Sequence, residues 1–201
     1  VYLTDDKTAA FAIEGRADGQ EAFLMLTKKG GFPLMMSITR SGVSGSEKSR
    51  DQLERDAENY MERAGMKDLK AVWFNRVDDY VAVNLAPVKE GVVFYTDLVK
   101  VRLSAGGEIE GFECSGYCAG SVKTGLTPSI TAEQAKAVVS DKIAISCVRL
   151  AVIPVDEKQV FCYEVAGSYK GLDYFVYVDA VSGKEVNILR VVDNKQGSMT
   201  M

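Results

Sequence analysis

Four cysteines are the side chains of this sequence best suited to bind a metal ion. Their spacing is C-x3-C and, further along, C-x14-C, whereas zinc ribbons and knuckles use closely spaced pairs. The last two lie within apolar segments, where a free thiol behaves as a small hydrophobic side chain. The pattern therefore favours free thiols, buried or at the surface, over a zinc site. The residues are Cys114, Cys118, Cys147 and Cys162.

Glu108 and Glu110 form the carboxylate pair closest to what acid–base chemistry requires. In the segment GEIEGFE they are two residues apart, which predicts that both point to one face of a strand. They lie beside a turn, so a structural role is favoured over a glycosidase pair. Carboxylates in VDD (Val77–Asp79) and DEK (Asp156–Lys158) are explained as turn residues, because solvent at a hairpin tip would not raise an acid's pKa.

Histidine is absent from the 201 residues, which excludes every His-containing catalytic triad and the commonest metal ligand. The segment GSVKTGLT (Gly120–Thr127) has the G-x4-G spacing of a phosphate loop, but Leu126 stands where the lysine should be. No buried strand precedes it, so it is interpreted as a linker. We predict no catalytic, cofactor-binding or metal-binding residues, and expect the chain not to be an enzyme.

The composition is that of an ordinary globular protein, with 47% hydrophobic and 26% charged residues. The length fits one large domain or two to three small ones. A net charge of −4 offers no basic face for phosphates, so nucleic acid is not an expected partner. No apolar run approaches the roughly 20 residues that cross a bilayer. Because the chain starts at Val1 without a signal peptide, we expect a fragment or a processed form.

Two segments have the signature of a helix start. SRDQ (Ser49–Gln52) and TAEQ (Thr131–Gln134) both fit a capping box, a hydroxyl followed three residues later by Gln. Apolar residues at helical spacing follow each of them, with Gly65 as the expected end of the first helix. The stripes are Leu53, Ala57, Tyr60, Met61 and Ala64, and then Ala135, Val138, Val139 and Ile143, which predicts a second helix reaching Ile143.

Each predicted helix precedes a series of β-branched and aromatic segments that are typical of strands. Ser182-Gly183-Lys184 is a typical hairpin turn, since Gly adopts a positive φ at little cost. The predicted strands are residues 71–76, 80–87, 92–103 and 108–113 after the first helix, and 147–154, 160–169, 174–180 and 185–192 after the second.

The pattern of glycines and apolar residues repeats with a period near 76 residues. Gly15, Gly19, Phe23 and Gly31 match Gly167, Gly171, Phe175 and Gly183 at an offset of 152. Gly106, Glu108 and Ile109 match Gly183, Glu185 and Val186 at an offset of 77. Three copies are predicted: a partial first repeat that lacks its helix (1–43), a second repeat (46–118) and a third repeat (128–195). The fold class is therefore α+β, each complete copy being a helix on an antiparallel sheet of about four strands.

Aromatic residues gather in the strands of the third copy. Alternation places Phe175 and Tyr177 on one face, and Tyr174 with the neighbouring valines 176 and 178 on the other. One face is expected to pack on the helix. The other is expected to pack in the core or against another repeat, with an exposed strip for a protein or glycan partner as the alternative. The aromatic set is Tyr163, Tyr169, Tyr174, Phe175 and Tyr177.

The last hairpin, YFVYVDAVSGKEVNILRV, resembles the PepSY module in its aromatic first strand, its Asp-x-x-Ser-Gly-Lys turn and its second strand. Three further segments resemble the C-terminal region of YpeB-type spore germination proteins of endospore-forming bacteria. They are DLVKVRLSAGGEIEGFECSGY (Asp97–Tyr117), RLAVIPVDEKQVFCYEVAGSY (Arg149–Tyr169) and GSMTM (Gly197–Met201). The resemblance covers essentially the whole chain.

This resemblance implies a non-enzymatic spore germination protein without cofactors. Its partner would be a spore cortex-lytic enzyme, a peptidoglycan hydrolase, which it stabilises or regulates. It implies a place at the outer side of the inner spore membrane or in the cortex, and a membrane anchor in the full-length protein that this fragment lacks. PepSY modules also occur in peptidase propeptides, so the alternative is an inhibitor or chaperone-like module acting on a secreted peptidase. Outside the membrane, a Cys114–Cys118 or a Cys147–Cys162 disulfide is an alternative to free thiols.

Overall fold

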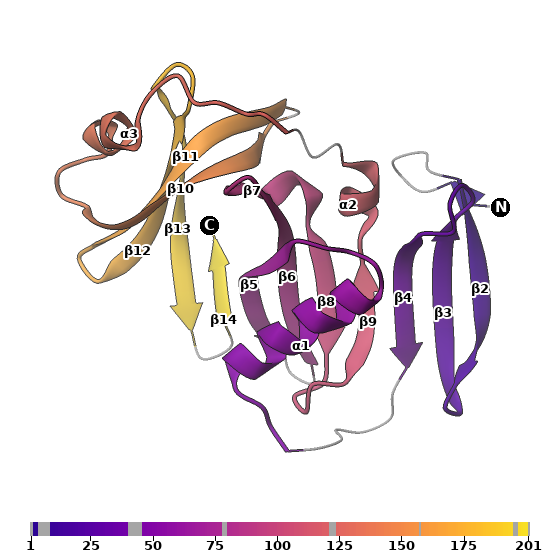
Figure 1. Ribbon diagram of the computed structural model, residues 1–201. Helices are drawn as coiled ribbons and strands as arrows, with labels where there is room; N and C mark the ends of the chain where they lie inside the picture. Colours follow the sequence, from indigo (N-terminus) through magenta and orange to yellow (C-terminus); the bar gives the residue numbers. More distant parts are fainter. Residues whose placement is uncertain are drawn as a thin grey trace. The chain divides into compact units, whose positions relative to one another are not determined.

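The computed structural model describes residues 2–3, 9–39, 46–77, 80–120, 124–156, 158–194 and 197–200 (Figure 1). The protein has short helices and mainly antiparallel strands, so the predicted α+β class is confirmed. Its chain divides into two compact units. Unit 1 consists of Val1–Pro87 and Asp97–Ser121, and unit 2 consists of Val88–Thr96 and Val122–Met201.

In unit 1, helix α1 (Arg50–Arg63) begins at the predicted capping box. The Gln52 N–H donates to the Ser49 side chain, and the Ser49 N–H donates to Gln52 Oε1 at 3.0 Å. Each bond satisfies a backbone donor that the first helical turn leaves without a partner. Gly65, with a φ of +92°, follows the C-cap residue Ala64 and ends the helix as expected.

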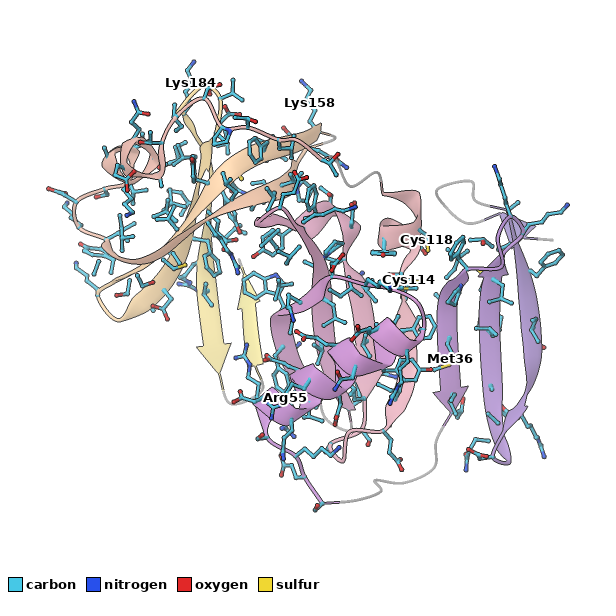
Figure 2. All side chains as sticks on the ribbon, viewed as in Figure 1. Met36, Arg55, Cys114, Cys118, Lys158 and Lys184 are labelled. Carbon is cyan, nitrogen blue, oxygen red and sulfur yellow. The ribbon has the colours of Figure 1, made fainter. Side chains whose placement is uncertain are left out.

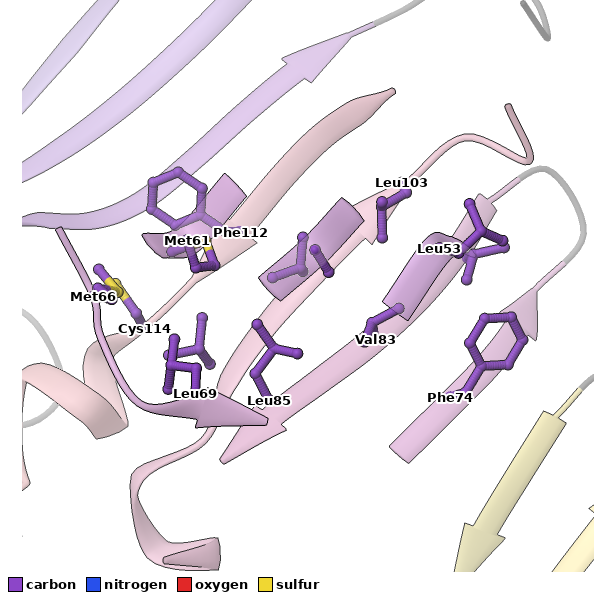
Figure 3. Close-up of a cluster of buried hydrophobic side chains, with 14 residues drawn as sticks. Leu53, Met61, Met66, Leu69, Phe74, Val83, Leu85, Leu103, Phe112 and Cys114 are labelled. Atoms are coloured by element: carbon purple, nitrogen blue, oxygen red, sulfur yellow. The ribbon is translucent and has the colours of Figure 1, made fainter. Parts of the chain in front are cut away.

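The strands of unit 1 pair in the order β1-β2-β3-β4-β9-β8-β6-β5, and each neighbouring pair is antiparallel. Helix α1 packs on β5 and β8 and buries its apolar stripe there, as Figure 3 shows for Leu53 and Met61. The short α2 (Ser115–Ala119) follows β9. The strands are β1 (Tyr2–Leu3), β2 (Ala9–Ala17), β3 (Gln20–Thr27), β4 (Pro33–Thr39), β5 (Leu69–Val77), β6 (Tyr80–Lys89), β8 (Val99–Leu103) and β9 (Ile109–Glu113).

In unit 2, five strands pair antiparallel in the order β14-β13-β12-β11-β10, and β7 (Val92–Phe94) adds to β10 in parallel. Helix α3 (Ala132–Val138) covers one face of this sheet and contacts β10 and β11, and Ala135 belongs to a buried cluster with side chains of β11 and β12. The strands are β10 (Ala144–Val155), β11 (Lys158–Tyr169), β12 (Leu172–Asp179), β13 (Glu185–Asn194) and β14 (Gly197–Thr200).

Two predicted boundaries were wrong. The single strand expected at 92–103 is divided by a 3-10 helix, Tyr95–Asp97, into β7 and β8, which pair with different strands. The second helix ends at Val138 instead of Ile143, because the next residue is already extended with a ψ of 141°. Val138, the last residue of α3, is 41% exposed, although the stripe placed it in the core. The first error arises because burial makes the segment 92–103 apolar whichever backbone conformation it has, and the second because apolar residues at helical spacing continue past the end of the helix.

Equivalent turns recur along the chain with the same backbone geometry. The residue pairs 18–19, 90–91 and 170–171 each have a positive φ at both positions, from +51° to +78°, as a type I′ hairpin turn requires. The β3–β4, β8–β9 and β12–β13 turns also match one another, since Gly31, Gly107 and Gly183 have φ values of +65°, +87° and +71°. The expected alignment of Gly106 with Gly183 is therefore wrong by one residue. The reason is that the β8–β9 loop, residues 104–108, is one residue shorter than the β3–β4 loop (27–32) and the β12–β13 loop (179–184).

Candidate functional site

A charged residue lies buried in the middle of the sheet of unit 2. On β11, Tyr163 and Val165 face α3, so Glu164 between them points to the opposite face. The Glu164 side chain is only 1% exposed. Its Oε1 accepts a hydrogen bond from Arg149 Nε at 2.7 Å, and its Oε2 accepts one from Tyr177 Oη at 3.0 Å. Arg149 Nη2 also donates to Tyr95 Oη at 2.6 Å, so the cluster connects β10, β11, β12 and the residue after β7.

In this cluster the pKa values of two tyrosines and of the arginine are raised. Burial, assisted by the charge of Glu164, raises the pKa of Tyr95 and of Tyr177, so both phenols remain protonated. For Arg149, burial opposes the charged form, but the carboxylate of Glu164 prevails and raises the pKa of the guanidinium. Both carboxylate oxygens already accept hydrogen bonds. The arrangement is thus suited to fixing four segments to one another.

Sequence reasoning missed this cluster, although a signal was present. Arg149 and Glu164 are single charged residues within otherwise apolar strand segments. In the β10–β11 ladder they are directly opposite each other. Opposite charges at one register position of two apolar strands predict a buried cross-strand ion pair.

The faces predicted for the aromatic residues are confirmed in part. Val176 and Val178 face α3 together with Tyr163, whose Oη donates to the Ile130 carbonyl at 3.0 Å. Tyr177 is on the other face and only 2% exposed, so it cannot belong to an exposed strip. The remaining three aromatic residues, Tyr169, Tyr174 and Phe175, are half-buried. They are the part of the aromatic set that is still accessible to a partner.

The four cysteines are free thiols in very different surroundings. Cys114 and Cys162 are buried, Cys118 is half-buried and Cys147 is exposed. Figure 2 labels Cys114 and Cys118. The sequence favoured free thiols, buried or at the surface, and Cys147 is of the second kind because its position in β10 faces solvent. A hydrogen bond with Cys118 and burial raise the pKa of Cys114, and burial raises that of Cys162 to about 12. Within the described ranges, no three His, Cys, Asp or Glu side chains are grouped to hold a metal ion.

These differences predict the order in which the thiols react. In native protein, an aromatic disulfide reagent should modify Cys147 first, because only this thiol is exposed. Cys114 and Cys162 should react only after unfolding, since burial hides them and disfavours their thiolates. The reaction is followed by absorbance. The fast phase of the reaction should come from Cys147 and should disappear in Cys147→Ser. A fast phase that survives this substitution would contradict the assignment, and fewer than four thiols after denaturation would reveal a disulfide.

The carboxylates singled out in the sequence have structural positions, in turns for Glu108 and Asp156 and in strand β9 for Glu110. Glu108 lies in the turn before β9, and Glu110 is the extra residue of a β-bulge that pairs with Arg102 at 3.4 Å. The bulge breaks the alternation that was expected to align the two carboxylates. Asp156 has a φ of +53°, as turn residues do, whereas residues 78, 79 and 157 lie outside the described residues. Of the predicted linker 120–127, residues 121–123 also lie outside them.

Two family models match nearly the whole chain. Residues 4–127 match the family described as "YpeB sporulation, PepSY1 and PepSY2 domains", and residues 129–189 match "Peptidase propeptide and YPEB domain". Neither is a catalytic family. Among the described residues, each helix is too short or too polar to span a bilayer.

Curated proteins with similar sequences are sporulation proteins. The sporulation protein YpeB of Halalkalibacterium halodurans is 23% identical over 169 residues, which cover 83% of this chain and 38% of that protein. The sporulation protein YpeB of Bacillus subtilis is 24% identical over 171 residues, with the same coverages of 83% and 38%. The chain thus spans well under half the length of these relatives.

The fold is also found in a solved structure. The Bacillus megaterium YpeB C-terminal domain superposes with a TM-score of 0.78, covering 94% of this chain and 92% of that domain at 22% identity. The identity is low, so the superposition shows a shared fold. The first family model alone covers more than half of the sequence. The chain therefore belongs to the YpeB-type sporulation proteins, of which it represents the C-terminal PepSY region.

Proposed function

We propose that this chain is a non-enzymatic partner of a spore cortex-lytic enzyme, a peptidoglycan hydrolase, and that it stabilises or regulates that enzyme. The observation that carries the proposal is the match of residues 4–127 to the YpeB sporulation family and of residues 129–189 to a PepSY family, neither of which is catalytic. The chemistry of the buried cluster supports it, because Glu164 is occupied by Arg149 and Tyr177. The proposal includes germination as the process, a place at the outer side of the inner spore membrane or in the cortex, and a membrane anchor in the longer protein.

The repeat organisation is part of the same proposal. We divide the chain into a partial repeat at 1–43 and complete repeats at 46–118 and 128–195. The recurring type I′ turns support this division. It is also supported by the β-bulges that follow the β3–β4, β8–β9 and β12–β13 turns, at Leu34, Glu110 and Val186. A chain built from such modules offers several similar surfaces, which suits a binding protein better than a single deep site.

A role on a secreted peptidase is the alternative, favoured by one observation. The model that matches residues 129–189 is named for peptidase propeptides as well as for YPEB. An inhibitor or chaperone-like module of that kind would slow a thermolysin-like peptidase or assist its refolding. Inhibition of thermolysin by this chain, without capture of the cortex-lytic enzyme, would favour the alternative.

Tyr174→Asp is the substitution chosen to test the partner role. Tyr174 is half-buried in β12, close to the Lys170–Gly171 turn, and does not belong to the core cluster under α3. A carboxylate placed in an interface without a partner costs several kcal/mol, so binding should fall while the fold persists. Spores that carry the variant should contain less cortex-lytic enzyme than the parent, measured by immunoblot beside the level of this protein.

Glu108→Gln is the matched control for catalysis. Glu108 lies in a turn, and Gln keeps its shape while removing its charge. A binding protein should tolerate this change, whereas a glycosidase would lose a carboxylate that it needs. Loss of cortex hydrolysis in this variant, with normal amounts of the lytic enzyme, would make the chain a catalyst and refute the proposal.

A further inference from the structure

Phe32 is a large apolar side chain held in place at the surface of unit 1. It is 62% exposed, more than any other large hydrophobic side chain in the described part of the chain. Its N–H donates to Thr27 Oγ1 at 2.9 Å, and its carbonyl accepts from the Thr27 N–H at 2.8 Å. The ring also lies against Gly30, where an added Cβ would be 2.6 Å from a ring carbon. The hydrogen bonds fix the backbone of Phe32, so only the two side-chain torsions of its ring are left to be ordered on binding.

The turn itself does not require an aromatic residue. In the two equivalent turns, the position of Phe32 is occupied by Glu108 and Lys184. Their carbonyls accept the same backbone hydrogen bond, at 2.8 Å each, from the N–H groups of Ser104 and Asp179. Charged residues thus serve this turn position equally well. The phenylalanine of the first turn needs a different explanation.

Phe32 borders a hollow between the β3–β4 turn and α2. The hollow has a volume of about 740 Å³. Tyr117 and Cys118 of α2 line it opposite the turn, and Lys28 and Lys29 lie at the same site. Both lysines are exposed, and in the described residues neither forms an ion pair. An apolar hollow beside two free cations is thus present on a chain whose net charge is −4.

We propose that this hollow binds an acidic segment of a partner protein. The segment would place an apolar side chain against Phe32 and Tyr117, and carboxylates against Lys28 and Lys29. Fixed aromatic residues supply most of the energy of such interfaces, and the lysines would select acidic segments and speed their approach. This inference rests on the proposed role as a binding partner and assigns that role a surface.

The test measures binding of fluorescein-labelled peptides to the intact chain by anisotropy. Twenty peptides differ only in one central residue, each natural amino acid in turn, between two Glu-Asp pairs. Peptides centred on Phe, Leu, Trp or Met should bind about tenfold or more tightly than the serine peptide. Phe32→Glu, which copies the equivalent middle turn, should abolish this preference. The double variant Lys28→Glu/Lys29→Glu should bind every acidic peptide more weakly than the parent does. Lys184→Glu, a charge reversal in the equivalent turn of unit 2 (Figure 2), is the matched control and should bind as the parent does.

Three outcomes would overturn the inference. Apolar-centred peptides could bind no better than the serine peptide, Phe32→Glu could leave binding unchanged in a protein with an unaltered melting temperature, or the anionic amphiphile dodecanoate could bind at Phe32 in place of the peptides. Capture of the cortex-lytic enzyme separates this result from the proposed function. Equal capture by the parent and by Phe32→Glu would reject this surface and keep the partner role, whereas no capture by the parent would reject the partner role itself.

Discussion

Replacing Arg149 by leucine is expected to lower the free energy of unfolding by about 3–5 kcal/mol. Glu164, whose side chain is 1% exposed, would keep its bond from Tyr177 but lose the only cation that it pairs with among the described residues. A buried carboxylate without a counter-ion is among the costliest defects in a protein interior. Urea-induced unfolding followed by circular dichroism would measure the loss.

The double variant Arg149→Leu/Glu164→Gln is the control for this interpretation. It removes both charges and keeps an acceptor for the Tyr177 hydroxyl, so we expect it to recover more than half of the lost stability. Recovery would assign the loss to the unpaired charge and not to the missing packing of the arginine stem. If the double variant were no more stable than Arg149→Leu alone, or if the single variant matched the parent, the buried pair would not have the proposed role.

The features predicted correctly from the sequence are those determined by a few neighbouring residues. The capping boxes at Ser49 and Thr131 start their helices as expected, because the Gln three residues later completes the hydrogen bonds within one turn. The alternation of Val176 and Tyr177 likewise placed them on opposite faces of β12. Such features need no knowledge of the rest of the chain.

The features that were missed depend on how one strand or helix is placed against another. The break at Tyr95 follows from the pairing of β7 with β10, a strand more than 50 residues later, as in the Val92–Leu150 pair. The ion pair of Arg149 with Glu164 needs the register of β10 against β11. The exposure of Phe32 next to α2 needs the tertiary structure of unit 1. A local pattern gives neither the pairing of β7 with β10 nor the position of α2 beside Phe32, so the candidate surface could not be predicted.

Leu53→Ala should cost about 2–4 kcal/mol of stability in unit 1. Leu53 is fully buried beneath α1, in the same cluster as Phe74, Val83 and Leu103 (Figure 3). The substitution removes three carbon atoms from a closely packed site, and the neighbouring strands cannot move together to fill the space. Alanine favours helix at least as well as leucine does, so the loss reports the cavity and not helix propensity.

Trp73, the single tryptophan of the chain, provides a local measurement of this effect because it lies in β5 on the sheet that α1 covers. Its fluorescence should shift to unfolded values at a lower urea concentration in Leu53→Ala than in the parent. Arg55→Ala is the matched control, since Arg55 is exposed on the same helix and its truncation leaves the core intact. An equal shift in both variants would indicate a loss of helix stability in general. A Leu53 variant as stable as the parent would mean that α1 is not docked on the sheet, and the helix-on-sheet unit assumed for the second repeat would have to be abandoned.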